Sequence, residues 1–112
     1  MKLALRRVML FVPDVDEVAD FYVEKLGLEV LHREAGFVDL DAGGARIGLH
    51  RSATAQPGRT KLCFYAKDVS AARARLVALG VKMGKDPGPG EGLQLCDGKD
   101  PAGNVFQLSN RA

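Results

Sequence analysis

The sequence contains the same pattern twice. The segment RVMLFVPDV begins at Arg7, and the segment KLCFYAKDV, with a matching alternation of apolar residues, begins at Lys61. Each segment reaches an aspartate, Asp14 or Asp68, and continues into a helical pattern that ends in Leu-Gly. A unit of one strand and one helix has therefore been duplicated. Two copies of a small module commonly meet at a cleft, and we expect the functional site to lie there.

The length of the chain limits what each copy can do alone. The chain has 112 residues, so each half has roughly 50 residues, too few to bury a sufficient core by itself. We therefore expect one domain over residues 1–112, in which the halves pack together or against a second chain.

Composition excludes several classes of partner. The apolar fraction of 46% and the charged fraction of 27% are ordinary for a globular protein. A formal net charge of +2 does not favour a nucleic-acid partner, and no apolar stretch is long enough to cross a membrane. Cys63 and Cys96 lack the C-x-x-C spacing, and we expect them to be reduced thiols in a cytoplasmic protein.

The first half is typical of a strand, a helix and three further strands. Asp14 is a candidate helix N-cap, with Glu17 three residues later, and Gly27 is a candidate C-terminal stop. The second half repeats this order, with a helix capped by Asp68. The expected strands are 4–12, 28–34, 36–41, 45–51, 60–66, 81–84, 93–97 and 104–110.

These elements predict an α+β fold of two βαβββ modules, mostly antiparallel, with a helix covering one face of each sheet. The first module is 4–51 and the second is 60–111. Residues 52–59, which are rich in small residues, are expected to be a linker.

Three segments carry a resemblance to a known family. They are the strand ending in Val-Pro-Asp, the segment FYVEKLGLEV from Phe21 to Val30, and DPAGNVFQL from Asp100 to Leu108. In this order they resemble the vicinal oxygen chelate superfamily, which includes glyoxalase I, bleomycin-resistance proteins, extradiol dioxygenases and fosfomycin-modifying enzymes. The resemblance implies two curved, incomplete barrels that enclose a U-shaped cavity. It also implies a homodimer.

The resemblance also indicates where a metal would be held. Metal-using members place one ligand, usually His, Glu or Gln, on each of four strands. Carried over residue by residue, these positions fall on Arg7, Gly48, Lys61 and Gln107. Only Gln107 has a side chain suited to coordination, because arginine offers no acceptor, lysine would have to lose a proton, and glycine has no side chain. We expect no metal and no other cofactor, with His50 as the alternative ligand of a non-standard site.

The alternation of residues along the strands predicts what lines the cavity. The face away from the helices combines apolar side chains with up to three fixed positive charges. Such a surface favours a small anionic or polar organic molecule, whose carboxylate or phosphate an arginine can bind through two hydrogen bonds. The expected ligand-binding residues are Arg7, Met9, Phe11, Arg46, His50, Lys61, Tyr65 and Gln107.

A structural interpretation of the same residues is equally open. Arg46 and Lys61 could extend into solvent at the strand ends, and Arg7 could pair with Asp39. The apolar members of the set could pack in an interface instead of against a ligand.

Three functions follow as hypotheses. The first is a metal-free binding module for a small organic molecule, as resistance proteins of the family capture drugs. The second is an enzyme: a metal-dependent lyase or isomerase like glyoxalase I, a dioxygenase, or a metal-free isomerase. The third is a partner subunit with a vestigial pocket. No catalytic residue is identified, because the spacing of Cys63 and His50 does not favour a nucleophilic pair.

Overall fold

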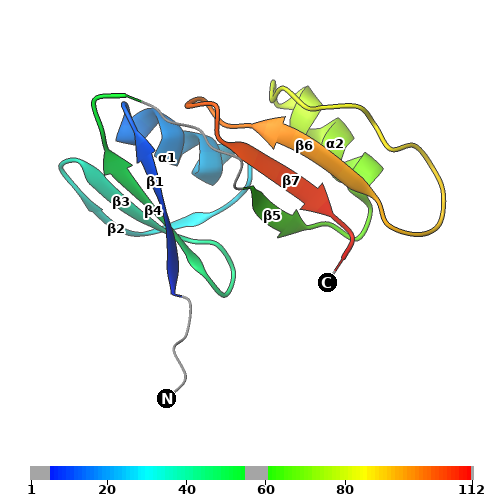
Figure 1. Ribbon diagram of the computed structural model, residues 1–112, viewed down its shortest axis with the longest axis horizontal. Coiled ribbons are helices and arrows are strands. Elements are labelled where there is room, and N and C mark those ends of the chain that lie inside the picture. The colour runs from blue at the N-terminus through cyan, green and yellow to red at the C-terminus, as the bar shows by residue number, and fades with distance from the viewer. Residues whose placement is uncertain (1–5, 55–60, 112) are drawn as a thin grey trace, which may run out of the picture. The chain divides into compact units, whose positions relative to one another are not determined.

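Figure 1 shows the computed structural model, which describes residues 6–54 and 61–111. The chain divides into two compact units, Met1–Gln56 and Pro57–Ala112, named unit 1 and unit 2 below. Each unit is a small sheet with one helix, which confirms the predicted α+β class. Three predicted features lie partly outside the described residues: the start of the first strand, most of the 52–59 linker, and residue 60 at the start of the second module.

Unit 1 has the predicted order of one strand, one helix and three strands. The elements are β1 (Arg7–Val12), α1 (Val15–Glu24), β2 (Glu29–Glu34), β3 (Phe37–Asp41) and β4 (Arg46–Arg51). The strands lie in the order β1-β4-β3-β2, and α1 lies on one face of this sheet (Figure 1). Strand β1 is parallel to β4, whereas the other pairs are antiparallel. The helix thus provides the crossover that two parallel strands require.

Unit 2 contains β5 (Leu62–Tyr65), α2 (Val69–Ala78), β6 (Leu95–Lys99) and β7 (Val105–Ser109). Its strands lie in the order β5-β7-β6, with β5 parallel to β7 and β6 antiparallel to it. The unit repeats the pairing of β1, β4 and β3 in unit 1. Helix α2 lies on one face of the sheet (Figure 1).

The prediction of a strand at 81–84 is wrong, because no regular strand forms there. Only a single bridge forms there, between Met83 and Gly98 on β6, supported by a hydrogen bond of 2.7 Å from the Gly84 amide to the Asp97 carbonyl. The chain then enters residues 86–92, where two prolines cannot donate to a ladder and glycines favour turns. Strand β6 accordingly begins at Leu95, two residues later than expected.

Both helices begin as the sequence predicts. An oxygen of Asp14 accepts a hydrogen bond of 3.0 Å from the Glu17 amide, and Asp68 accepts one of 2.9 Å from the Ala71 amide. Gly27 follows α1 with φ of 78°, a left-handed conformation that glycine adopts without strain. Both caps confirm the duplicated pattern. In the described part of the chain, no helix is long and apolar enough to span a bilayer.

The core of each unit lies between its sheet and its helix. In β3, β4 and β7, alternate residues point to the helix and are almost fully buried, as the period-two pattern predicts, whereas β2 is exposed along its whole length. Each such apolar side chain stabilises its unit by about 1.5–3 kcal/mol. The core of unit 1 includes Val12, Val18, Tyr22, Val38, Leu40, Ile47 and Leu49, and that of unit 2 includes Val69, Leu76, Val81, Cys96, Phe106 and Leu108.

Candidate functional site

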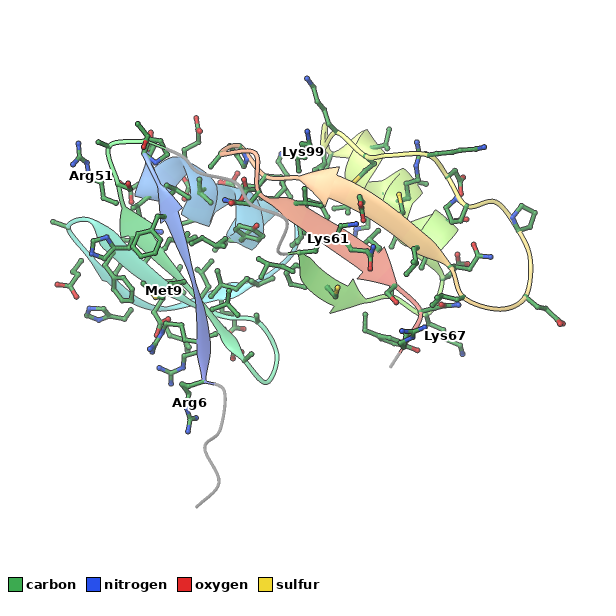
Figure 2. The ribbon with its side chains drawn as sticks, in the orientation of Figure 1. Arg6, Met9, Arg51, Lys61, Lys67 and Lys99 are labelled. Atoms are coloured by element: carbon green, nitrogen blue, oxygen red, sulfur yellow. The ribbon has the colours of Figure 1, made fainter. Side chains whose placement is uncertain are left out.

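The face of each sheet that points away from its helix is named the open face. In unit 1, strand register arranges the side chains of this face in three rows that cross all four strands. Figure 2 shows Met9 over the middle of the sheet, with Arg6 and Arg51 at its opposite ends. The charged row is Arg7, Arg46, Asp41 and Glu29; the central row is Met9, Gly48, Asp39 and His32; the aromatic row is Phe11, His50, Phe37 and Glu34.

Two arginines share one carboxylate on this face. Arg7 Nε lies 2.8 Å from Asp39 Oδ1, and its Nη2 lies 3.0 Å from Oδ2. Arg46 Nη1 lies 3.2 Å from the same Oδ2. The hydrogen bonds from Arg7, and more weakly those from Arg46, hold the pKa of Asp39 below its usual value although burial acts in the opposite direction. Asp39 is therefore ionised at neutral pH, and the three side chains together carry one net positive charge.

Gly48 makes the contact between Arg7 and Asp39 possible. Strand β4 lies between β1 and β3, so the Arg7 side chain must cross the β4 backbone to reach the carboxylate. A Cβ atom at Gly48 would lie 2.7 Å from Arg7 Cδ and 2.5 Å from Met9 Sδ, closer than atoms of this kind can approach. The missing side chain leaves the space over β4 that Arg7 and Met9 occupy, which gives this glycine a packing role.

The aromatic row presents a ring and a hydrogen-bond acceptor. The ring centroids of Phe11 and His50 are 5.6 Å apart, and Phe11 is 55% exposed. His50 Nδ1 lies 2.9 Å from the carbonyl oxygen of Arg51. A carbonyl oxygen can only accept, so Nδ1 carries the proton of this hydrogen bond. When the ring is neutral, its Nε2 therefore carries a lone pair on the open face.

Unit 2 contains a second ion pair at the equivalent place. Lys61 Nζ lies 2.7 Å from Asp97 Oδ2, and Gln107 Nε2 donates a hydrogen bond of 2.9 Å to Asp97 Oδ1. Figure 2 shows Lys61 over this sheet. Burial alone would raise the pKa of Asp97, but the hydrogen bonds from Lys61 and Gln107 outweigh it and keep the pKa below its usual value. Both carboxylate oxygens thus have a partner.

The register shows that the two ion pairs are copies of one arrangement. Asp39 on β3 lies opposite Gly48, and Asp97 on β6 lies opposite Gln107. In each unit, the residue at or just before the start of the first strand reaches across the central strand to a carboxylate on the third. Within residues 6–54 and 61–111, no three His, Cys, Asp or Glu side chains gather as a metal ion would need.

Unit 2 also contains several cavities. One, of about 710 Å³, lies at the start of α2 and is lined in part by Lys67, Ser70 and Asp86. In it, the Ser70 hydroxyl donates a hydrogen bond of 2.7 Å to Asp86, and the Gly88 amide donates one of 2.9 Å to the same oxygen. Another cavity, of about 360 Å³, lies where residues 82–84 meet the end of β6 and the start of β7.

Comparison with known proteins decides the family. A family model described as the Glyoxalase/Bleomycin resistance protein/Dioxygenase superfamily matches residues 4–108. The chain belongs to this superfamily. The resemblance drawn from Phe21–Val30 and Asp100–Leu108 is confirmed, and with it the glyoxalase-like fold.

Solved structures of the superfamily agree over the whole chain. An integron cassette protein, VCH_CASS1, from the mobile metagenome of V. cholerae is 26% identical, with a TM-score of 0.78 over 100% of this chain and 98% of that chain. Lactoylglutathione lyase from Agrobacterium tumefaciens is 24% identical, with a TM-score of 0.79 over 95% and 92% of the two chains. TioX from Micromonospora sp. ML1 is 21% identical, with a TM-score of 0.78 over 97% of both chains. At these identities, the last two likenesses show the fold alone.

The open faces bring together the residues that the sequence singled out, separately in each unit. Arg7, Met9, Phe11, Arg46 and His50 share the open face of unit 1. The open face of unit 2 holds the remaining predicted residues, Lys61, Tyr65 and Gln107. The free cysteine Cys63 is exposed on the same face. Their role in binding a ligand stays a prediction.

Sequence reasoning missed residues that matter to the site. The pairing of Arg7 with Asp39 was only an alternative, and it is present. Asp97, Lys82 and Lys99 were not considered. Asp39 and Asp97 each lie in the middle of the strand before the last strand of their unit, so comparison of the two halves beyond the first strand was the signal that could have found them.

Proposed function

We propose that the chain is a metal-independent member of the superfamily that binds a small, anionic or polar organic molecule on the open faces of its sheets. The observation that supports this proposal is the pair of internal ion pairs. In metal-using members, the positions of Arg7 and Lys61 hold metal ligands; here both residues are cations, each bound to a carboxylate of its own sheet.

The other two positions are equally unsuited to a metal. Gly48 offers no ligand atom, and its side-chain space is occupied by Arg7 and Met9. The amide nitrogen of Gln107 donates to Asp97, while its oxygen lies 3.7 Å from the Cys63 thiol. A divalent cation would have to displace these contacts and lie beside fixed positive charge, which opposes binding.

The open faces do offer contacts to an organic molecule. Phe11 and Tyr65 are 55% and 59% exposed, so each presents most of a ring on its sheet. An aromatic surface beside a few polar groups is typical of small-molecule sites. Arg46 shares Asp39 with Arg7, so one positive charge beside the central row is left for an anionic group.

A thermal-shift screen over divalent metals and small organic acids tests this proposal, because a ligand that binds only the folded state raises the melting temperature. We expect stabilisation by one or more organic molecules and none by zinc, nickel, manganese or iron. The alanine variants of Arg46 and Phe11 should lose the stabilisation by the ligand, and Lys25→Ala on the helix side serves as control. Stabilisation by a metal alone would reject the proposal.

His50 supports a second candidate function. Because its Nδ1 carries the proton of the hydrogen bond to Arg51, its Nε2 carries a lone pair when the ring is neutral, and such a nitrogen is a ligand or a general base. The second candidate is therefore a metal-dependent lyase or isomerase of the glyoxalase I type, or a dioxygenase, with non-standard ligands. It requires a turnover that depends on added metal and disappears in His50→Ala. The same turnover with and without metal would reject this second candidate.

We also propose that the chain forms a homodimer in the cytoplasm. Leu95 and Tyr65 are 42% and 59% exposed and flank Ser109 in one row of the open face of unit 2. Apolar side chains that gather on one face are often covered by a second chain. Free thiols at Cys63 and Cys96 are typical of a reducing compartment. Light scattering coupled to size-exclusion chromatography should give twice the mass of one chain. The mass of one chain at all concentrations would contradict the dimer.

A further inference from the structure

The cavity of unit 2 that lies at residues 82–84 has an unusual distribution of charge. Its lining includes Lys82, Lys99 and the half-buried Val105, and Asp97 is the acidic residue of its lining. A volume of about 360 Å³ falls in the range of small-molecule sites, which is roughly 300–1,000 Å³. Figure 2 shows Lys99 at the end of β6, where the cavity lies.

The acid of this cavity is already neutralised from outside it. Asp97 accepts a hydrogen bond on each carboxylate oxygen, one from Lys61 at 2.7 Å and one from Gln107 at 2.9 Å, and neither donor lines the cavity. The next acid along the chain, Asp100, is buried and accepts hydrogen bonds from the Ala102 and Asn104 amides in its own turn.

The two lysines of the cavity therefore keep their charge. Among the described residues, no ion pair is formed by Lys82 or Lys99. Both residues are exposed. The cavity thus offers two ammonium groups beside the apolar side chain of Val105.

Comparison with unit 1 shows that this charge is particular to unit 2. Lys99 and Val105 pair in the register, and their counterparts in unit 1 are Asp41 and Arg46. The end of the unit 1 sheet therefore mixes both signs of charge, whereas the end of the unit 2 sheet carries lysines and apolar residues.

We propose that this cavity binds an amphipathic organic carboxylate, with the carboxylate between Lys82 and Lys99 and the apolar part against Val105. The inference goes beyond the proposed function, because it places a further ligand site in unit 2, whereas Arg46 and Phe11 belong to unit 1. Ammonium groups bind carboxylate as point charges, and the apolar surface of Val105 contributes by removing hydrocarbon from water.

Amide chemical-shift mapping on the full, isotope-labelled chain tests this site with three probes. Hexanoate carries both features of the ligand, hexanamide has the same chain without the charge, and inorganic phosphate has charge without a chain. We expect hexanoate to bind most tightly and to shift amides of residues 82–84, 98–99 and 105. Added salt should weaken its binding, since screening reduces the attraction between charges.

Variants localise the charge. Lys82→Ala and Lys99→Ala should each weaken hexanoate binding by about five-fold or more, whereas Lys99→Arg should retain it. Lys67→Ala is the matched control, because Lys67 is an exposed lysine of unit 2 that lines the cavity at the start of α2. The Lys67→Ala variant should bind hexanoate as tightly as the parent protein does. All these positions are exposed, so the variants should fold as the parent does.

Three results would overturn the site. Phosphate or hexanamide binding as tightly as hexanoate would reject an amphipathic carboxylate. Equal loss of affinity in Lys67→Ala would mean that surface charge in general, and not this cavity, attracts the probe. Shifts confined to unit 1, around Phe11 and His50, would reject this cavity while leaving the proposed function standing, because that function is tested by metal dependence and the thermal-shift screen.

Discussion

Units 1 and 2 each have an ion pair at the equivalent place, but the surroundings of the two pairs differ. In unit 1, the Asp39 side chain is 4% exposed and shared by two arginines, one of which passes over Gly48. In unit 2, the Asp97 side chain is 43% exposed and is bound by one lysine and an amide. Duplication has preserved the position of the carboxylate, but β3 lies between two strands whereas β6 lies at the edge of its sheet.

The comparison shows what the two carboxylates can contribute. A buried carboxylate must be fully hydrogen-bonded, because an unpaired charge there is strongly unfavourable. An exposed pair exchanges its partner for water at little cost. We therefore expect unit 1 to depend on its ion pair for stability and unit 2 to depend on it mainly for the charge balance of its open face.

The largest effect is expected from removal of the carboxylates. Asp39→Ala should lower the free energy of unfolding by about 2–3 kcal/mol, because two arginines lose charged hydrogen bonds and a buried gap is left. Asp97→Ala should cost less than about 1 kcal/mol, as exposed pairs do. Urea denaturation of both variants measures the difference. Equal losses would break the comparison between the units.

The next effect concerns the central strand. Gly48→Ala should lower the free energy of unfolding by about 1 kcal/mol, because the new Cβ atom displaces Met9 and Arg7, whose flexible ends can move aside. Gln107→Ala at the equivalent place in unit 2 removes a half-buried side chain that donates a hydrogen bond to Asp97, and should cost up to about 1 kcal/mol. Thermal and urea denaturation check both. A neutral Gly48→Ala would show that Arg7 does not need the space over β4.

A smaller effect is expected from pH. The pKa of Asp39 is lowered from 3.8 by its arginines, so its contribution to stability is complete above that value and is lost as pH falls through the lower folded pKa. Asp39→Asn should therefore be less stable than the parent at neutral pH, and the difference should shrink below about pH 4. A difference that stays constant in acid would mean that the charge of Asp39 is not what stabilises unit 1.

The smallest effect on stability is expected on the exposed rings. Phe11→Ala and Tyr65→Ala should each change the free energy of unfolding by less than about 0.5 kcal/mol, since both rings are more than half exposed. Their effect should appear instead in the loss of stabilisation by an organic ligand. A large loss of stability in both variants would indicate an interface with a second chain, and dilution experiments would then separate dimer loss from unfolding.

Much of the fold follows from the sequence because local rules agree with one another. Asp14 and Asp68 cap their helices, and alternate residues of the strands reach the core, as their patterns predict. The exception is 81–84, where the apolar pattern is short and the proline- and glycine-rich segment that follows does not continue a strand. Propensity alone could not show that only Met83 would pair.

The candidate site was less predictable, because it depends on contacts between strands. Alternation placed Arg7 and Arg46 on the open face, but it could not show that both bind Asp39. That requires the strand order β1-β4-β3, which a sequence does not state. The cavity beside Lys82 and Lys99 was missed for the same reason, since it forms where distant residues meet at a sheet edge.

The central claim is that internal ion pairs take the place of a metal site, and metal analysis tests it most directly. Protein purified without a histidine tag should be incubated with zinc, nickel, manganese or iron and freed of unbound metal, and its metal content measured by elemental mass spectrometry. The account predicts well below one ion per chain for every metal. One tightly bound ion per chain, lost in His50→Ala, would contradict it.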